Sequence, residues 1–269
     1  MKNILIIGAN GFTGRRILND LSVNPIYHVT GCSLRDDICP GKDYRFVRTD
    51  IRDENEVRKL FKECRPDIVI NTSALSVPDY CETHHAEAEA TNVTAVETIA
   101  HVCEQYGSRF IHLSTDFVFD GKSTRLYKEE DEAIQVNYYG VTKLKAEKII
   151  ASICSNYAIV RVVVVYGKAL PGQHGNILQL VANRLRNGET IRVVSDQWRT
   201  PTFVGDISVG VEKLMFHTAN GIYHICGSEC LTIAEIAYRV ADFLKLDRSL
   251  IEPVTTEEMK EVTPRPRFS

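Results

Sequence analysis

Residues 4–14 read Ile4-Leu5-Ile6-Ile7-Gly8-Ala9-Asn10-Gly11-Phe12-Thr13-Gly14, an apolar run that passes directly into a glycine-rich loop. A continuous apolar run is typical of a parallel strand buried on both faces. The glycines form the pattern G-x-x-G-x-x-G, and a helix is expected over about 15–21. Small residues let a backbone approach a pyrophosphate, and a helix N-terminus offers free N–H groups. The stretch therefore predicts a nucleotide-binding strand, loop and helix, with a plain tight turn as the alternative.

Further along the chain, apolar runs alternate with helical patterns. Strands are expected at 27–33, 45–48, 68–70, 109–113 and 158–166, and the main helices between them at 53–64, 84–106 and 138–154. This alternation predicts an α/β fold, a Rossmann-type doubly wound parallel sheet with right-handed connections.

The regular pattern loosens after residue 167. Helices are expected at 176–187, 206–217 and 233–246, and strands at 190–194 and 221–226. We therefore expect an NADP-binding Rossmann domain at 1–167, onto which 203–226 packs back. Residues 168–202 and 227–269 are expected to form a small C-terminal substrate-binding lobe.

Composition excludes several classes of protein. Of 269 residues, 44% are hydrophobic and 25% charged, with a formal net charge of −3, as is ordinary for a globular protein. The absence of a basic excess argues against nucleic-acid binding. No apolar run is long enough to cross a membrane, and the first one is too short for a signal peptide, so a cytoplasmic protein is expected. Eight cysteines without a C-x-x-C pair predict free thiols and no metal site.

The end of the second strand bears on the choice of dinucleotide. NAD(H) would predict an acidic residue there to hold the ribose hydroxyls, but the chain has Ser33 and Arg35. These residues suit a 2′-phosphate, and Arg15 could assist them. Asp36 and Asp37 follow and weaken the argument, so NADP(H) is predicted while NAD(H) stays possible.

Polar residues at other strand ends are expected to line the same crevice. Asp50 could hold the adenine amino group while Ile51 packs on the ring. Asn92 lies within an apolar helical face and, if buried, needs partners. The predicted cofactor-binding residues are Gly8, Asn10, Gly11, Phe12, Thr13, Gly14, Ser33, Arg35, Asp50, Ile51, Thr72, Ser73, Ala74, Asn92, Tyr139 and Lys143.

The pair Tyr139 and Lys143 carries the predicted chemistry. Residues four apart share one helical face, and a cation held close to a phenol lowers its pKa. By spacing alone, such a pair is usually an ordinary surface feature. The Ser114-Thr115 strand end, which faces the same crevice, favours the functional interpretation. Tyr138 is the rival phenol, but it is five residues from Lys143.

Together these motifs resemble the extended short-chain dehydrogenase/reductases, and within them the dTDP-4-dehydrorhamnose reductase family. That family of sugar-nucleotide reductases includes the methionine adenosyltransferase β-subunit-like proteins. The resemblance runs nearly end to end. It rests on the glycine loop, 65–71, Ser114-Thr115-Asp116-Phe117-Val118-Phe119-Asp120-Gly121, 139–143, Asp196-Gln197 with Pro201-Thr202, and 265–269. The run from Ser114 to Gly121 is the most specific of these.

The resemblance implies a catalytic trio of Thr115, Tyr139 and Lys143. It implies that NADPH delivers hydride to the carbonyl carbon of a nucleotide-linked 4-keto-6-deoxy sugar while Tyr139 acts as general acid. Thr115 would orient the carbonyl oxygen, and Lys143 would bond the nicotinamide ribose and lower the pKa of Tyr139.

Departures from the family pattern lie on the substrate side. Val164 stands where these reductases often carry Trp, and Trp198-Arg199-Thr200 stands where a Gly is common. The sugar is therefore not fixed by the resemblance. The residues expected at the substrate are Ser76, Asp116, Phe117, Val164, Trp198 and Arg199.

Two other functions stay open. One is a non-catalytic NADP-binding regulatory subunit like the methionine adenosyltransferase β-subunit. The other is an epimerase, dehydratase or other reductase of the same superfamily, although Phe117 stands where dehydratases typically carry Glu. A homodimer is possible.

Overall fold

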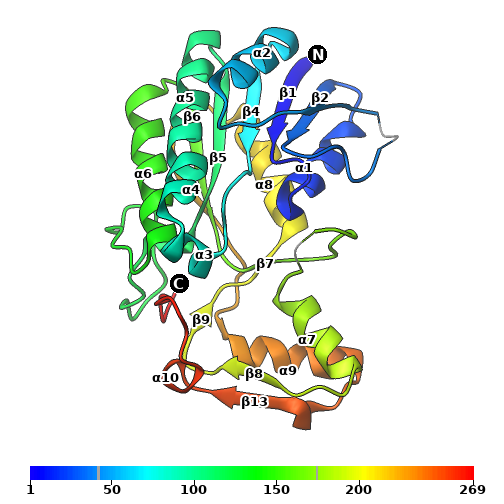
Figure 1. Cartoon of the computed structure of the whole chain (residues 1–269), viewed down its shortest axis with the longest axis vertical. Coiled ribbons are helices and arrows are strands. Elements are labelled where there is room, and N and C mark those ends of the chain that lie inside the picture. The colour runs from blue at the N-terminus through cyan, green and yellow to red at the C-terminus, as the bar shows by residue number, and fades with distance from the viewer. Residues whose placement is uncertain (41–42, 174) are drawn as a thin grey trace.

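The computed structural model describes residues 1–40, 43–173 and 175–269. Within them, seven parallel strands form a central sheet in the order β11-β6-β5-β4-β1-β2-β3 (Figure 1). The strands are β1 (Lys2–Ile7), β2 (Tyr27–Ser33), β3 (Arg45–Arg48), β4 (Ile68–Asn71), β5 (Arg109–Thr115), β6 (Tyr157–Val162) and β11 (Gly221–Ile225). The order reverses between β1 and β4, where ligands bind in open α/β sheets. The predicted doubly wound α/β class is confirmed.

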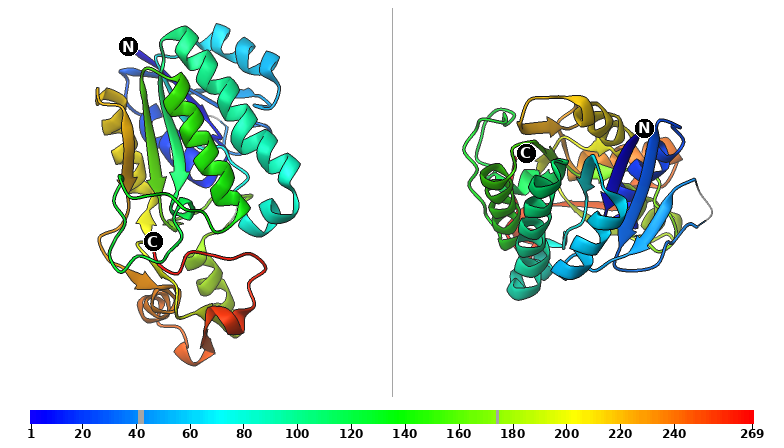
Figure 2. Two further views of the ribbon diagram at one scale, coloured as in Figure 1. Left: turned by 90° about the vertical axis from the view of Figure 1, so that its left-hand side faces the viewer. Right: turned by 90° about the horizontal axis from the view of Figure 1, so that it is seen from above.

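Helices cover both faces of this sheet, as the two turned views in Figure 2 show. The helices α1 (Phe12–Ser22) and α8 (Val204–Phe216) pack on one face, and α2 (Glu54–Cys64), α5 (Ala95–Tyr106) and α6 (Tyr138–Ile153) on the other. Strand β1 shows how one apolar run can pack against the helices on both faces of the sheet. Ile4 and Ile6 enter the first core while Leu5 and Ile7 enter the second, because successive side chains of a strand point to opposite faces.

The helix expected over 84–106 is found at 85–106, but it is not α-helical throughout. The chain forms α3 (Pro78–Thr83), α4 (His85–Glu89), a π-helical segment η1 (Ala90–Thr94) and then α5. Pro78 suits a helix start, since its missing N–H is unpaired there in any case. The π segment places Asn92 inward at zero exposure. Such segments interrupt the apolar periodicity too little to be recognised in a sequence.

The strand expected over 158–166 also breaks. Strand β6 ends at Val162, and Val164 has a φ of 35°, which a β-branched residue rarely adopts. The following β7 (Val165–Tyr166) leaves the central sheet and pairs with β10 (Thr202–Phe203). The Thr202 hydroxyl donates to the Val163 carbonyl at 2.8 Å, and the Thr202 amide donates to Val164 at 3.2 Å. Contacts from a distant segment thus hold the strained turn.

A second, smaller core lies below the sheet in Figure 1. There α7 (Ile177–Arg186) and α9 (Ile233–Leu244) pack on β8 (Ile191–Val194) and β13 (Ile251–Val254), which pair in parallel. Sequence patterns did not indicate β13. The remaining elements are η2 (Asp116–Val118), β9 (Trp198–Arg199), β12 (Leu231–Thr232), η3 (Arg248–Leu250) and α10 (Thr256–Met259). The residue boundaries of the two expected domains stay a prediction.

The eight cysteines are free thiols, four of them buried, as predicted. Across the described ranges, no helix has the length and apolar character needed to cross a membrane.

Gly14 sits where the first helix meets the first and fourth strands. A Cβ there would lie 2.3 Å from the Gly8 carbonyl oxygen and 2.5 Å from the Thr72 hydroxyl. Gly14→Ala should lower the free energy of unfolding by about 1–3 kcal/mol, because backbone has to shift. Gly175→Ala is the control, because apart from the chain neighbours the nearest described atom would lie 3.5 Å from the added Cβ. Denaturant unfolding checks both, and equal stabilities would contradict this account.

Candidate active site

The glycine loop leaves the start of α1 open. Gly11 is the N-cap residue, and among the described residues no side chain caps the helix N-terminus. The first N–H groups of α1 therefore face outward, toward the position where a phosphate binds in such folds. Of the other predicted loop residues, Gly8, Phe12 and Thr13 are half-buried.

Asn10 is fully engaged in holding the neighbouring loop. Its amide nitrogen donates to the Arg35 and Asp36 carbonyls at 3.2 and 2.8 Å, and its oxygen accepts from Arg15 at 2.8 Å and from the Ile38 amide at 3.3 Å. Asn10 thereby fixes the segment that carries Arg35.

Arg15 neutralises Asp37. Its guanidinium donates to Asp37 at 2.5 Å and to the Tyr44 hydroxyl at 2.7 Å, and Tyr44 donates to Asp37 at 2.7 Å. Burial raises the pKa of Asp37, but hydrogen bonds from the Cys39 amide, Tyr44 and Arg15 outweigh it, so its pKa is below the usual value. The expectation that Arg15 could assist a 2′-phosphate is wrong, since it is buried and already paired.

The other cofactor-side residues lie at the C-terminal ends of β2, β3 and β4. Arg35 is exposed and Ser33 half-buried. Asp50 pairs with Arg52, and Ile51 is half-buried beside it. The half-buried residues Thr72, Ser73 and Ala74 follow β4, and the Thr72 hydroxyl donates to the Ile7 carbonyl at 2.9 Å.

Asn92 is used inside the protein. Its oxygen accepts from the Leu75 amide at 2.8 Å, and its nitrogen donates to the Leu75 carbonyl at 3.0 Å and to the Thr142 hydroxyl at 3.1 Å. These bonds tie the segment after β4 to α6. The buried Asn92 amide thus has the hydrogen-bond partners expected of it. Its effect on the crevice is indirect, because it holds the backbone of the segment after β4 in place.

The structure brings Thr115 and Tyr139 together at the end of β5. The side chains of both are largely buried, and the Thr115 hydroxyl lies near enough to the phenol to act toward a lower Tyr139 pKa. The larger effects act in the opposite direction: burial and the Asp116 charge raise the pKa of Tyr139. Gly140 allows this approach, because a Cβ there would lie 2.2 Å from the Phe117 carbonyl oxygen.

Lys143 points toward β5. Its ammonium nitrogen lies 2.7 Å from the Leu113 carbonyl oxygen and 2.8 Å from His112 Nε2. Burial lowers the pKa of Lys143 to about 8, against the attraction of Glu147. The expected lowering of the Tyr139 pKa by Lys143 is not found, since in this structure the cost of burying a phenolate dominates.

A buried ion pair joins α6 to β6, and the sequence analysis did not predict it. Glu147 accepts from Arg161 at 2.7 and 3.1 Å and from the Ser114 hydroxyl at 2.5 Å. Both charged side chains are under 5% exposed. The one signal in the sequence was Arg161 itself, a lone charge within an apolar strand, which needs a buried partner.

The segment 263–269 lies against the end of β5. Ser269 donates to Asp116 at 2.5 Å, and Asp116 accepts from Thr115 at 3.1 Å. Arg199 donates to the Pro266 carbonyl at 2.6 Å and lies 3.7 Å from Asp116. Burial lowers the pKa of Arg199, while Asp116 acts to raise it.

The six predicted substrate residues do not share one environment. Ser76 and Trp198 are exposed, Phe117 and Val164 are half-buried, and Asp116 and Arg199 are buried and paired with each other. Phe117 packs against Tyr139, with ring centres 5.8 Å apart. Trp198 pairs with the backbone of Phe268.

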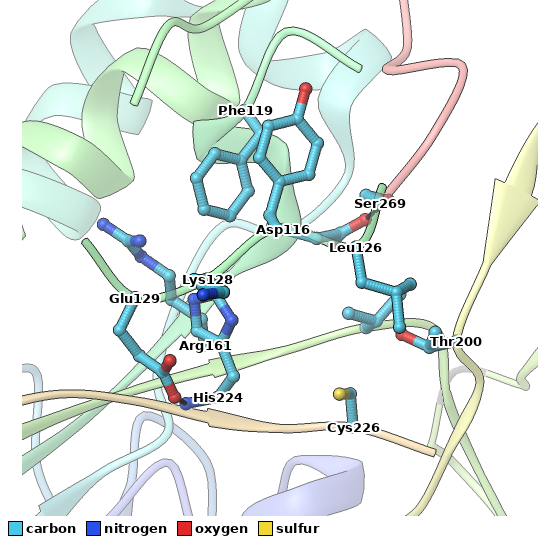
Figure 3. Close-up of a pocket in the computed structure, with 12 residues that line it drawn as sticks. Asp116, Phe119, Leu126, Lys128, Glu129, Arg161, Thr200, His224, Cys226 and Ser269 are labelled. Carbon is cyan, nitrogen blue, oxygen red and sulfur yellow. Dashed lines mark hydrogen bonds between the residues drawn. The ribbon is translucent and has the colours of Figure 1, made fainter. Parts of the chain in front are cut away.

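A cavity of about 170 Å³ adjoins Asp116 (Figure 3). Arg161, Val163, His224 and Cys226 line its strand side. Phe119 stacks on Tyr127 at 4.1 Å on its loop side. The trio itself does not line it. Within the described part of the chain, no group of three or more His, Cys, Asp or Glu residues could hold a metal ion.

Comparison with known proteins agrees with this arrangement. The model of the family described as RmlD substrate binding domain matches residues 1–269. The structure of dTDP-4-dehydrorhamnose reductase from Bacillus anthracis in complex with NADP is similar, with a TM-score of 0.88 and 27% identity, covering 100% of this chain and 89% of that chain. The structure of the ortholog from Clostridium acetobutylicum is also similar. Its TM-score is 0.84 and its sequence identity 29%, and the match covers 99% of this chain and 88% of that chain.

Proteins of similar sequence have names that indicate different functions. The chain is 31% identical to the spore coat polysaccharide biosynthesis protein SpsK of Bacillus subtilis, over 100% of the chain and 88% of the relative. It is 30% identical to the probable low-salt glycan biosynthesis reductase Agl14 of Haloferax volcanii, over 98% of this chain and 87% of the relative. It is also 31% identical to methionine adenosyltransferase 2 subunit beta of Xenopus laevis, over 98% and 78%.

The sheet order, the glycine loop and the Tyr139–Lys143 helix define an extended short-chain dehydrogenase/reductase. With the family model matching all 269 residues, the chain belongs to the RmlD substrate binding domain family, that of the dTDP-4-dehydrorhamnose reductases. The resemblance seen in the sequence is confirmed.

The buried ion pair offers a stability test. Glu147→Gln should lower the free energy of unfolding by about 3–5 kcal/mol, because it leaves the Arg161 charge buried without its counter-ion. Glu63→Gln, which breaks a surface pair with Arg45, should change it by less than about 1 kcal/mol. Denaturant unfolding measures both, and a loss in Glu147→Gln as small as that of the control would refute the assigned role.

Proposed function

We propose that this protein is an NADPH-dependent reductase of a nucleotide-linked 4-keto-6-deoxy sugar. The observation that carries the proposal is the meeting of Thr115 and Tyr139 at the carboxyl end of β5, with Lys143 one helical turn further on. This is the edge where the strand order reverses and where the glycine loop presents the start of α1. Similarity to reductases, one of them crystallised with NADP, supports it.

When bound, the cofactor supplies the hydride that reduces the carbonyl carbon. Thr115 orients the carbonyl oxygen, and Tyr139 donates its proton to the oxygen as negative charge develops there. The raised pKa of Tyr139 suits this direction, because it keeps the phenol protonated at neutral pH. Lys143 holds the nicotinamide ribose.

The site fits a dinucleotide with a 2′-phosphate. Asp37 would repel such a group, but its charge is compensated by Arg15. Arg35 remains as an exposed cation on the segment that Asn10 anchors. The carboxylates of Asp36 and Asp37 were the two features of the sequence that argued against NADP(H). The pairing of Asp37 with Arg15 removes the second of them.

Replacing Arg35 tests the preference. Arg35→Ala should weaken NADPH binding about 10- to 100-fold, the loss of a charge-assisted contact, while NADH binding changes little. Arg45→Ala, which removes an exposed arginine of β3 paired with Glu63, is the control. Fluorescence titration with each cofactor measures both constants, and a parallel loss of NADPH and NADH affinity would contradict the assignment.

Replacing Tyr139 tests the chemistry. Tyr139→Phe should reduce kcat for NADPH-dependent reduction of dTDP-4-keto-6-deoxy sugars by about 10²-fold or more, with NADPH affinity retained. Tyr138→Phe removes the neighbouring phenol, which donates to Glu89, and should leave kcat within about twofold. NADPH consumption checks both. Wild-type inactivity across a panel of such sugars would overturn the proposed reaction.

For the substrate, we propose the side formed by Ser76, Phe117, Val164 and Trp198, together with the lobe at 168–202 and 227–269. A groove of about 940 Å³ in this lobe is lined by residues of α7, α8 and α9 and by none of those four residues, and it is large enough for a nucleotide-linked sugar. The identity of the sugar, the cytoplasmic location and a homodimer stay predictions.

A regulatory subunit is the second candidate, because a methionine adenosyltransferase subunit is as similar in sequence as the reductases. Under that hypothesis, the chain co-purifies with a larger enzyme, and Tyr139→Phe preserves its effect on that enzyme. Loss of the effect in the variant would favour the reductase.

A further inference from the structure

The segment 263–269 contacts both parts of the molecule. It runs from the region of α10 back to the carboxyl end of the central sheet (Figure 2, left view, in red). The Trp198 amide donates to the Arg267 carbonyl at 2.7 Å, and the Ser269 amide donates to the Trp198 carbonyl at 3.0 Å. Trp198 lies in β9, which pairs with β12 at the start of α9. The segment is thus joined through backbone hydrogen bonds to the smaller core.

Asn137 joins the same segment to the helix that carries Tyr139. The side-chain nitrogen of Asn137 donates to the Pro264 carbonyl at 2.9 Å, across 127 residues of the chain. Its side-chain oxygen accepts from the Gly140 amide at 2.9 Å and caps α6, of which Tyr139 is the second residue. Asn137 is only 5% exposed, so both bonds are shielded from water.

The two partners fix the orientation of the Asn137 amide. A backbone N–H can only donate and a carbonyl can only accept, so the oxygen faces Gly140 and the nitrogen faces Pro264. Capping needs the oxygen alone, and Asp or Ser serves about as well as Asn at this position. The bond from the nitrogen to Pro264 is therefore not part of the cap.

A second contact of the segment lies next to Thr115. The Ser269 hydroxyl donates to one carboxylate oxygen of Asp116 at 2.5 Å, and the other oxygen accepts from the Thr115 hydroxyl at 3.1 Å. The segment is therefore bonded to the neighbour of Thr115 and, through Asn137, to the first turn of α6.

We propose that Asn137 is a positioning residue whose amide nitrogen holds the first turn of α6, and with it Tyr139, against segment 263–269. Because this segment is also bonded to Trp198, Asn137 connects the smaller core to the helix of the proton donor. The connection is a property of the folded chain, while its bearing on turnover rests on the proposed function.

Other contacts of this turn hold it within the larger part of the molecule. The Tyr138 amide donates to Glu82 of α3 at 2.9 Å, and the Tyr138 hydroxyl donates to Glu89 of α4 at 3.2 Å. These bonds fix α6 beside the sheet. Loss of the Pro264 bond should therefore free Tyr139 relative to the smaller core and leave the helix folded.

Asn137→Asp separates the two roles of the side chain. A carboxylate keeps the cap and is favourable at a helix N-terminus, but it presents an acceptor to the Pro264 carbonyl. The Trp198 and Ser269 amides should exchange with solvent about 10-fold faster than in the wild type, while the Gly140 amide keeps its protection. Hydrogen exchange followed by NMR measures all three amides. Acrylamide quenching of Trp198, the one tryptophan of the sequence, should increase as well.

Gln135→Glu is the matched control. It introduces the same charge two residues earlier, where the Gln135 side chain donates to the Ala133 carbonyl at 2.9 Å. The Trp198 and Ser269 amides should exchange in this variant as they do in the wild type.

The positioning role has a kinetic readout. Asn137→Asp should lower kcat for NADPH-dependent reduction by about 10- to 100-fold, because small misplacements of a proton donor are costly. The Kd for NADPH and the midpoint of unfolding should stay at their wild-type values, which a variant that had lost the cap would not show.

Wild-type exchange of the Trp198 and Ser269 amides in Asn137→Asp would overturn the inference, because capping would then be the sole role of Asn137. Loss of protection at Gly140 as well would also overturn it. If Asn137→Asp does not fold, Asn137→Ser keeps a capping oxygen without a charge and decides by the same criteria.

The two proposals can fail separately. A wild-type protein without turnover would refute the proposed reductase and leave the exchange results standing. A wild-type kcat in an Asn137→Asp protein with a loosened segment would refute the positioning role alone.

Discussion

The structure depends on the burial of one parallel sheet on both faces. Each central strand has to offer apolar side chains to two cores, as β1 does with Ile4 and Ile6 on one side and Leu5 and Ile7 on the other. Polar groups are then tolerated only at the strand ends or in fully paired networks. The site is built from those exceptions: the hydroxyl of Thr115 at a strand end, and the amide of Asn71 and the ring of His112 in buried networks.

Two glycines let helices approach the strand ends closely, and this close approach forms the crevice. Gly14 lets α1 reach the first and fourth strands, and Gly140 lets α6 pack against the turn after β5. The first approach positions the helix N-terminus where a phosphate can bind. The second holds Tyr139 next to Thr115. Neither approach would be possible with a side chain at these positions.

Two buried networks then surround Lys143. One is the Glu147–Arg161 pair, and the other is the Ser73–Asn71–His112 series. In a buried environment an unpaired proton donor is costly, so the protonation state of one group constrains that of the next. The pKa values within the trio therefore depend on buried residues around it as well as on the residues that line the crevice.

The sequence by itself determined the order of the strands in the central sheet and of the main helices, the glycine loop and the Tyr139–Lys143 spacing, because each depends on residues close in the chain. Only the tertiary structure decided the π segment around Asn92, the strained turn at Val164, the pairing of Arg15 with Asp37 and the direction in which Lys143 points. Those features depend on partners up to 50 residues away in the chain, or on the balance of burial against charge. Periodicity shows which face of a helix or strand is apolar. The pKa of a side chain and the direction of its hydrogen bonds depend instead on the groups that the fold places next to it.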